Sequence, residues 1–197
     1  EFRRVLFRSS VRVGPVTGKE ILLVAHYDAV VLDNGKLVDA VVDNAASVVA
    51  MIEATRRLSG QTKHPVRLLL TDQEELGLVG AKAWAKTNGT ANLAAVINAD
   101  INAYGDTLMY GLNNGPQSAG INKAVSDLCA ARRAPCLDFP QYPPSDDLVF
   151  SGAGVYAPGT FQEAIDGTVT VGLSITPPAT GEESTFSLHG LLDLLFD

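Results

Sequence analysis

Short runs of hydrophobic residues divide the chain and predict strands that are buried on both faces. In the first half these runs lie at 21–25, 66–70 and 94–98, and a later one lies at 168–175. Runs of this length without polar alternation are typical of a sheet that helices cover on both sides.

Segments with a helical spacing of hydrophobic residues lie between these runs. The clearest begins at Asn44, ends with Arg56 and Arg57 in its last turn, and is followed by Gly60. The alternation of strand and helix predicts an α/β fold with a largely parallel sheet. The expected helices are 44–58, 78–87 and 117–132, and the expected loops are 135–144 and 177–184.

Length and composition are those of one globular domain. The chain has 197 residues, of which 46% are hydrophobic and 19% are charged, and its formal net charge is -7. A negative charge argues against a nucleic-acid or anionic-membrane surface, because either partner favours a basic patch. No hydrophobic run approaches the roughly 20 residues that span a bilayer.

Ionisable side chains gather at the carboxyl ends of the predicted strands. His26, Glu74, Glu75 and Asp100 each come directly after a hydrophobic run, and Asp43 opens the helix between the first two strands. These strand ends meet at one edge of an open α/β sheet, where ligands bind. Imidazole and carboxylate together form a ligand set that zinc accepts, and cobalt or manganese could replace zinc.

Each of these residues also has a structural explanation. Asp43 could be only a helix N-cap, Glu74 and Glu75 could favour a helix dipole, and His26 and Asp100 could be ordinary polar residues. All of these explanations would have to hold at one edge of one sheet, so we favour a metal site. Two adjacent glutamates at the end of a buried strand also repel each other unless a cation lies between them.

The residues resemble peptidase family M28, the zinc-dependent aminopeptidases. The order and approximate spacing of four segments match across residues 21–100, and Glu-Glu-x-Gly-Leu-x-Gly-Ala is the most specific of them. Downstream, Ser145-Asp146-Asp147 resembles the family's Ser-Asp segment and His189-Gly190 its final histidine segment. The four segments are His26-Tyr27-Asp28, Asp43-Asn44-Ala45-Ala46-Ser47, residues 74–81 and Asp100.

The resemblance implies a three-layer α/β/α fold of the zinc-exopeptidase type, with a mostly parallel mixed central sheet. It also implies two Zn²⁺ ions that activate water for removal of N-terminal residues from peptides. Glu74 would be the general base, and Asp28 would orient the ring of His26. The implied metal ligands are His26, Asp43, Glu75, Asp100 and His189, with Asp43 bridging the two ions.

The sequence departs from the family pattern in two places. Ala40-Val41 stand where Gly-Ala usually precedes the bridging aspartate, and Gly154-Val155-Tyr156 replaces a Gly-Ile-Pro-like step. A relative of the glutamate carboxypeptidase or glutaminyl cyclase type, which would use the same site differently, is an alternative. A non-catalytic scaffold is another, although it would be expected to lack some ligands.

The two ends of the sequence carry a separate expectation. Residues 1–9 back-translate in one frame to an EcoRI-like site followed by a common sequencing-adapter string, so we expect a non-native tail there. We expect 10–197 to be a single zinc-peptidase domain that is truncated at both ends. The oligomeric state cannot be read from these patterns.

The cysteines and the cellular location stay open in the sequence. Cys129 and Cys136 could form one small disulfide loop or be two free thiols. The family resemblance and the acidic composition favour a secreted or periplasmic protein, and a cytoplasmic protein is the alternative.

Overall fold

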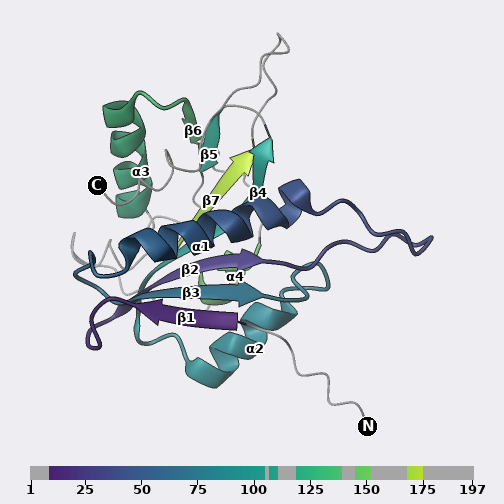
Figure 1. Ribbon diagram of the computed structural model, residues 1–197, viewed down its shortest axis with the longest axis horizontal. Coiled ribbons are helices and arrows are strands. Elements are labelled where there is room, and N and C mark those ends of the chain that lie inside the picture. The colour runs from purple at the N-terminus through teal and green to yellow at the C-terminus, as the bar shows by residue number, and fades with distance from the viewer. Residues whose placement is uncertain (1–8, 105–106, 111–118, 139–144, 152–167, 175–197) are drawn as a thin grey trace.

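The fold has three layers, with helices on both faces of a mixed, mostly parallel sheet (Figure 1). The computed structural model describes residues 9–104, 107–110, 119–138, 145–151 and 168–174. The strands are β1 (Ser9–Val13), β2 (Glu20–His26), β3 (Val66–Thr71), β4 (Leu93–Tyr104), β5 (Leu108–Tyr110), β6 (Cys136–Asp138) and β7 (Thr168–Ser174). The helical elements are the kinked turn η1 (Val41–Ala45), α1 (Ala46–Leu58), α2 (Val79–Asn88), α3 (Ala119–Arg132) and α4 (Asp147–Ser151).

The main sheet has five strands in the order β1-β3-β2-β4-β7. β3, β2, β4 and β7 run parallel, and β1 pairs antiparallel with β3 at the edge. The chain passes from β2 to β3 on one side and returns to place β4 on the other side of β2. This reversal beside β2 is a topological switch point, the place where α/β sheets commonly bind ligands.

Both faces of the sheet are covered, as the unbroken hydrophobic runs predict. On β2, Leu23 and Ala25 pack in one core with residues of α1 and α3, whereas Leu22 and Val24 pack in the other with residues of α2 and α4. In the second core the ring centroids of Trp84 (α2) and Phe150 (α4) lie 6.0 Å apart, edge to face. This contact anchors α4 and the segment before it beneath the sheet.

Two predicted boundaries were wrong. The helix predicted from Asn44 begins at Ala46, because Asp43 and Asn44 have non-helical backbone angles in η1. The third strand continues to Tyr104, so Asp100 lies within it rather than after it. Pairing of β4 with β2 nevertheless stops at Asn98, which leaves Asp100 beyond the end of that ladder.

Only some of the hydrophobic residues of α1 belong to the core. Met51, Ala54 and Leu58 are buried, and these side chains form the stripe that packs on the sheet. The exposed fractions of Val49 and Ile52 are 60% and 47%, so these two residues do not belong to the core.

Three strands were missed: β1, β5 and β6. β1 is short and mostly exposed, and an edge strand of this kind lacks the continuous hydrophobic run that marks the central strands. β6 lies within the stretch predicted to be a loop and pairs with β5. Cys129 and Cys136 are bonded to each other, which ties the end of α3 to β6. Among the described helices, none has the length and hydrophobicity needed to cross a membrane.

Candidate metal centre

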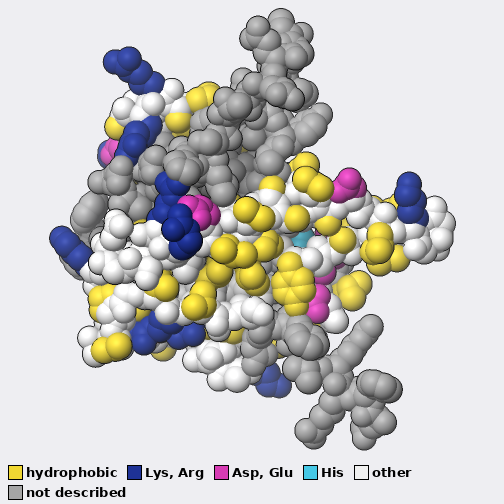
Figure 2. Space-filling model, viewed as in Figure 1, with side chains coloured by type: hydrophobic (Ala, Val, Ile, Leu, Met, Phe, Trp, Pro, Cys, Tyr) yellow, Lys and Arg dark blue, Asp and Glu magenta, His cyan; other side chains and the backbone are white. Residues whose placement is uncertain are grey.

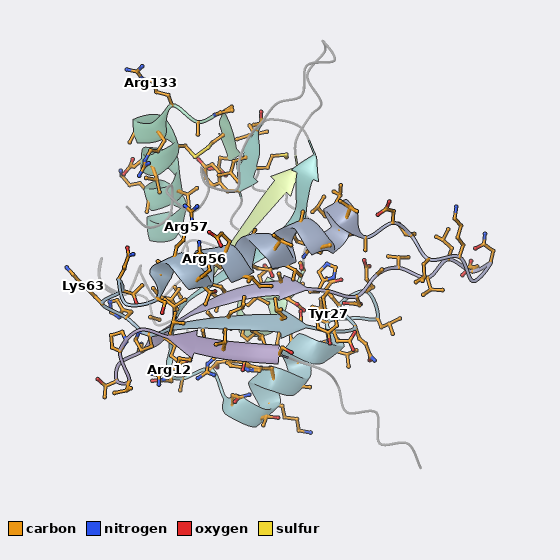
Figure 3. All side chains as sticks on the ribbon, in the orientation of Figure 1. Arg12, Tyr27, Arg56, Arg57, Lys63 and Arg133 are labelled. Atoms are coloured by element: carbon orange, nitrogen blue, oxygen red, sulfur yellow. A yellow bond between two sulfur atoms is a disulfide. The ribbon has the colours of Figure 1, made fainter. Side chains whose placement is uncertain are left out.

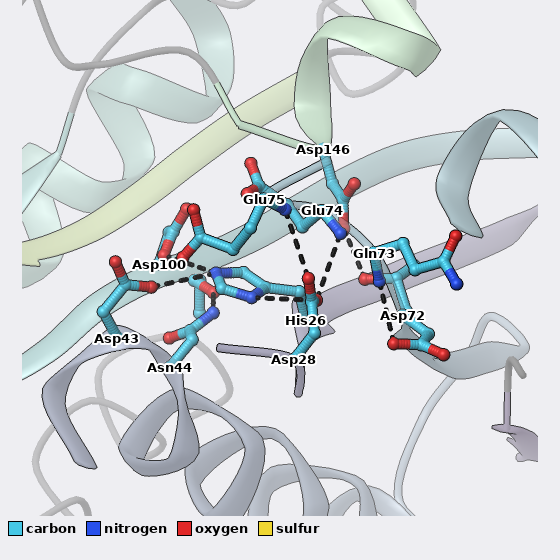
Figure 4. Close-up of polar contacts among 12 residues, drawn as sticks. His26, Asp28, Asp43, Asn44, Asp72, Gln73, Glu74, Glu75, Asp100 and Asp146 are labelled. Atoms are coloured by element: carbon cyan, nitrogen blue, oxygen red, sulfur yellow. Dashed lines mark hydrogen bonds and ion pairs between the residues drawn. The ribbon is translucent and has the colours of Figure 1, made fainter. Parts of the chain in front are cut away.

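The carboxyl ends of β2, β3 and β4 bring His26, Asp28, Asp43, Glu74, Glu75 and Asp100 together (Figure 4). Tyr27 marks this end of the sheet in Figure 3, whereas Arg12 and Lys63 lie at the opposite end. The position is the one expected from the sequence, because parallel strands place their carboxyl ends at one edge.

The imidazole of His26 lies at the centre of the cluster and is 1% exposed. Its Nε2 lies 3.1 Å from Oδ1 of Asp43 and 3.1 Å from Oδ1 of Asp100. Its Nδ1 lies 3.4 Å from Oδ1 of Asp28. A proton held on Nδ1 by Asp28 would leave the Nε2 lone pair facing the other two carboxylates, which is how a histidine is presented to a metal.

Asp28 joins this histidine to the two glutamates. The backbone N–H groups of Glu74 and Glu75 donate to its Oδ1 and Oδ2, at 3.1 and 3.2 Å. Burial raises the pKa of Asp28, but the hydrogen bonds with His26 and the two amides outweigh it and lower the pKa overall. The carboxylate therefore stays charged and fixes both the imidazole and the Glu-Glu backbone.

Asn44 positions Asp43 on η1. Its side-chain Nδ2 donates to the carbonyl oxygen of Ala99 at 2.9 Å, and the residue is completely buried. The peptide bond between Asp43 and Asn44 is cis. The contact ties η1 to β4 next to Asp100, which brings the two aspartates to the same side of His26. The sequence pattern identified Asn44 only within the Asp43-Asn44-Ala45-Ala46-Ser47 segment and did not predict this contact.

A closed turn presents the two glutamates. The N–H groups of Gly77 and Leu78 both donate to the carbonyl oxygen of Glu74, and that of Gly80 donates to Asp72. A Cβ atom on Gly80 would lie 2.4 Å from the carbonyl oxygen of Asp72, so this close approach requires glycine. The turn explains why Glu-Glu is followed by a glycine-rich segment.

Two non-glycine residues beside the site have left-handed backbone conformations. The φ angles are 59° at Gln73, directly before Glu74, and 52° at Ile101, directly after Asp100. Such conformations are uncommon for side-chain-bearing residues and cluster at functional sites.

Asp146 is a further buried carboxyl group that the sequence did not identify as a site residue. It is completely buried, its Oδ1 has no hydrogen-bond partner, and its Oδ2 accepts a hydrogen bond from the hydroxyl of Thr71 at the end of β3. Burial raises the pKa of Asp146 to about 6, although the Thr71 hydroxyl lowers it. In the sequence, residues 145–146 resemble the family's Ser-Asp segment, but that resemblance did not assign Asp146 a role in the site.

The pKa values of the two glutamates are higher than those of ordinary surface carboxylates. Burial raises the pKa of Glu74 to about 7; the charges of Asp100, Asp146 and Glu75 add to the effect, and His26 opposes it. Burial and the charge of Asp43 also raise the pKa of Glu75. Burial lowers the pKa of His26, but hydrogen bonds with Asp100, Asp28 and Asp43 outweigh it and raise the pKa to about 12.

The arrangement fits a bound cation. Atoms able to ligate a metal lie within 4.8 Å of one another in two groups, His26-Asp43-Asp100 and His26-Glu74-Glu75. Ligands at 2.0–2.1 Å from a tetrahedral zinc are about 3.3 Å apart, close to the two 3.1 Å separations at His26. Oε1 of Glu75 is buried without a hydrogen-bond partner, and a metal ion would satisfy it.

His189 lies outside the described residues, and so does 152–156, which contains the divergent Gly-Val-Tyr step. The expected role of His189 as a ligand therefore stays a prediction.

Comparison with known proteins agrees with this geometry. The sequence profile of peptidase family M28 matches residues 11–168, which is most of the chain. The chain belongs to peptidase family M28. Family membership supports a metal-dependent peptidase. No curated protein sequence matches this M28 chain significantly.

Solved structures share the fold of this M28 chain at low sequence identity. Porphyromonas gingivalis glutaminyl cyclase is 16% identical with a TM-score of 0.69, and the match covers 95% of this chain and 73% of that one. The Aneurinibacillus sp. strain AM-1 aminopeptidase is 17% identical with a TM-score of 0.66, covering 95% and 45%. Legionella pneumophila LapB is 15% identical with a TM-score of 0.64, covering 95% and 56%. The chain thus spans about half the length of the last two.

Proposed function

We propose that the protein is a di-zinc aminopeptidase that removes N-terminal residues from peptides. The observation that carries the proposal is the position of His26, with Nε2 at 3.1 Å from both Asp43 and Asp100, beside the carboxyl group of Glu74. A family assignment alone does not choose among the reactions of this fold, so the proposal rests on the site.

Each proposed ion has its own ligands. His26 and Asp100 would hold one ion and Glu75 with His189 the other, while Asp43 would contact both. When bound, zinc supplies a Lewis acid that polarises the peptide carbonyl and makes a water molecule acidic near neutral pH. Asp28 would keep the ring of His26 oriented, as its 3.4 Å contact with Nδ1 supports.

Glu74 would move the proton. Its carboxylate takes a proton from the attacking water and delivers it to the nitrogen of the leaving amine. The carboxyl group of Glu74 has an oxygen within 4.8 Å of ligating atoms of His26 and Glu75, so it would lie beside the ion and the attacking water. The surplus of carboxylates would also attract the positively charged amino terminus of a peptide, which favours cleavage at chain ends.

A glutaminyl cyclase is the second candidate. Two of the solved structures that share the fold are glutaminyl cyclases, from Porphyromonas gingivalis and an Acidobacteriales bacterium. For a peptide that begins with glutamine, the same general base could serve transfer of the acyl group to the substrate's own amine, which releases ammonia instead of an amino acid.

Product analysis with three peptides tests the proposal. An aminopeptidase releases free leucine from leucyl-peptides and leaves the N-acetylated peptide intact. A cyclase leaves both uncut and converts a glutaminyl peptide to its pyroglutamyl form. Cleavage of the acetylated peptide, or no reaction in the zinc-loaded protein, would contradict the proposal.

We also propose that the protein is exported. The disulfide between Cys129 and Cys136 supports an oxidising compartment, since such bonds are rare in the cytosol.

A further inference from the structure

The 28–40 hairpin projects from the sheet edge that carries the site (Figure 1). Its two arms are joined by backbone hydrogen bonds from Leu32 to Lys36 and from Val38 to Val30, at 2.9 and 3.0 Å. Gly35, with φ of 78°, permits the reversal at the tip. The hairpin is therefore a hydrogen-bonded element.

Hydrophobic side chains of this hairpin face solvent. Val31 and Leu37 stand opposite each other as a bridge pair, so their side chains lie on one face, and their exposed fractions are 60% and 65%. Val38 is 41% exposed. Clustered exposure of this kind on a water-facing element marks a binding surface.

The exposed hydrophobic surface continues along the margin of the metal site. Tyr27 follows His26, Leu76 follows Glu75, and Val41 precedes Asp43 by two residues; all three side chains are exposed. In Figure 2, hydrophobic side chains border a recess that contains histidine and carboxylate atoms, next to the projecting hairpin. The site thus has a charged floor and a hydrophobic margin.

We propose that this margin and the 28–40 hairpin bind hydrophobic side chains of the peptide substrate that follow the scissile bond. The inference rests on the proposed aminopeptidase function and names its substrate class: peptides with a hydrophobic second residue. The charged floor holds the reacting groups and the hydrophobic margin adjoins it, so the side chain that follows the scissile bond would meet the margin. Both arms of the hairpin join that floor directly, one through Asp28 and the other through Asp43.

The charges of the hairpin argue against an anionic lipid surface as its partner. Besides Asp28, the segment carries Asp33 and Asp39 but only one cation, Lys36. Membrane-surface elements of this kind depend on basic residues. A second copy of the chain is the remaining occupant, and the oligomeric state distinguishes it.

The test compares leucinamide, leucyl-leucyl-glycine and leucyl-serylglycine as substrates of the zinc-loaded protein. Leucinamide has no second residue and reports the reaction alone. We expect kcat/KM for the leucyl peptide to exceed that for the seryl peptide about tenfold. The double variant Val31→Ser/Leu37→Ser should reduce this ratio to about twofold, with hydrolysis of leucinamide unchanged.

Val16→Ser is the matched control, because Val16 is 83% exposed in the connection that leads into the amino end of β2, away from the site. It should leave the ratio unchanged. Calorimetric binding of both tripeptides to the Glu74→Gln variant should show the same preference without turnover. A ratio near one, or one that the double variant does not alter, overturns the inference alone. A wild type that is dimeric while Val31→Ser/Leu37→Ser is monomeric would assign the surface to a second copy. Failure of the wild type to hydrolyse leucinamide would overturn the proposed function as well.

Discussion

The three aspartates around His26 contact different nitrogens of its imidazole. Asp43 and Asp100 face Nε2 of His26. Asp28 faces Nδ1 and accepts hydrogen bonds from the backbone N–H groups of Glu74 and Glu75. Asp28 is therefore placed to orient the ligands of a metal without itself being one.

The Asp28→Asn variant should bind zinc about 10–100-fold more weakly than the wild type. An amide has one oxygen in place of two, so it cannot hold the imidazole and both backbone amides as the carboxylate does. Competition with a zinc-sensitive dye measures the affinity, and Asp33→Asn on the exposed hairpin is the matched control. Equal affinity of Asp28→Asn and wild type would contradict the role.

The stability of the metal-free protein should fall as pH rises. The pKa of Glu74 is raised from 4.5 to about 7 and that of Asp146 from 3.8 to about 6, so the folded state binds more protons than the unfolded state in those windows. For His26 the window runs from 6.5 to about 12 and acts in the same direction. All three contributions are fully present below the lower pKa and lost as pH rises through the higher one.

Thermal unfolding of the chelated protein at pH 5 and pH 8 checks this prediction. We expect a lower Tm at pH 8, and a smaller difference in Asp146→Asn. Saturating zinc should raise the Tm at pH 8 by mass action. A chelated protein that becomes more stable between pH 5 and pH 8 would contradict the assignment of these shifts.

Among the elements, the turn from Asp72 to Gly80 does most to shape the site. It reverses the chain directly after β3 and holds its own backbone closed through Glu74 and Asp72. Because a Cβ atom on Gly80 would meet the Asp72 backbone, the turn depends on glycine at this position.

Gly80→Ala should lower the free energy of unfolding by about 1–3 kcal/mol and weaken zinc binding, since relief of the clash must displace the turn. Gly35→Ala is the control: its φ is 78° but nothing lies within 4 Å, so it should cost only about 1–2 kcal/mol and leave zinc binding intact. Denaturant titration and metal competition measure the two effects. Unchanged zinc affinity in Gly80→Ala would show that the turn does not position the glutamates.

The elements differ in how far the sequence predicts them. The central strands could be predicted because β2, β3 and β4 are covered on both faces and carry continuous hydrophobic runs. β1 could not, since one antiparallel edge strand has no such pattern. The beginning of α1 was misplaced because η1 keeps a helix-like sequence while its backbone departs from the helix at Asp43.

At the scale of the whole molecule, the predicted ligands within the described residues lie at one edge of one sheet. That convergence followed from strand order, since His26 ends β2, Asp100 lies in β4 and Glu74 lies in the turn after β3, and these three parallel strands are neighbours. Asp146 could not be assigned in the same way. Its place in the site depends on how α4 packs through Phe150 against Trp84, a long-range contact that no local pattern encodes.

The most direct test of the account is the turnover of Glu74→Gln on leucinamide together with its bound zinc. We predict two zinc ions per chain in the wild type and the variant, with kcat reduced about 10²–10⁴-fold in the variant. Such a result would separate the residue that moves the proton from the residues that hold metal. Unreduced turnover in the variant, or no bound zinc in the active wild type, would contradict the central claim.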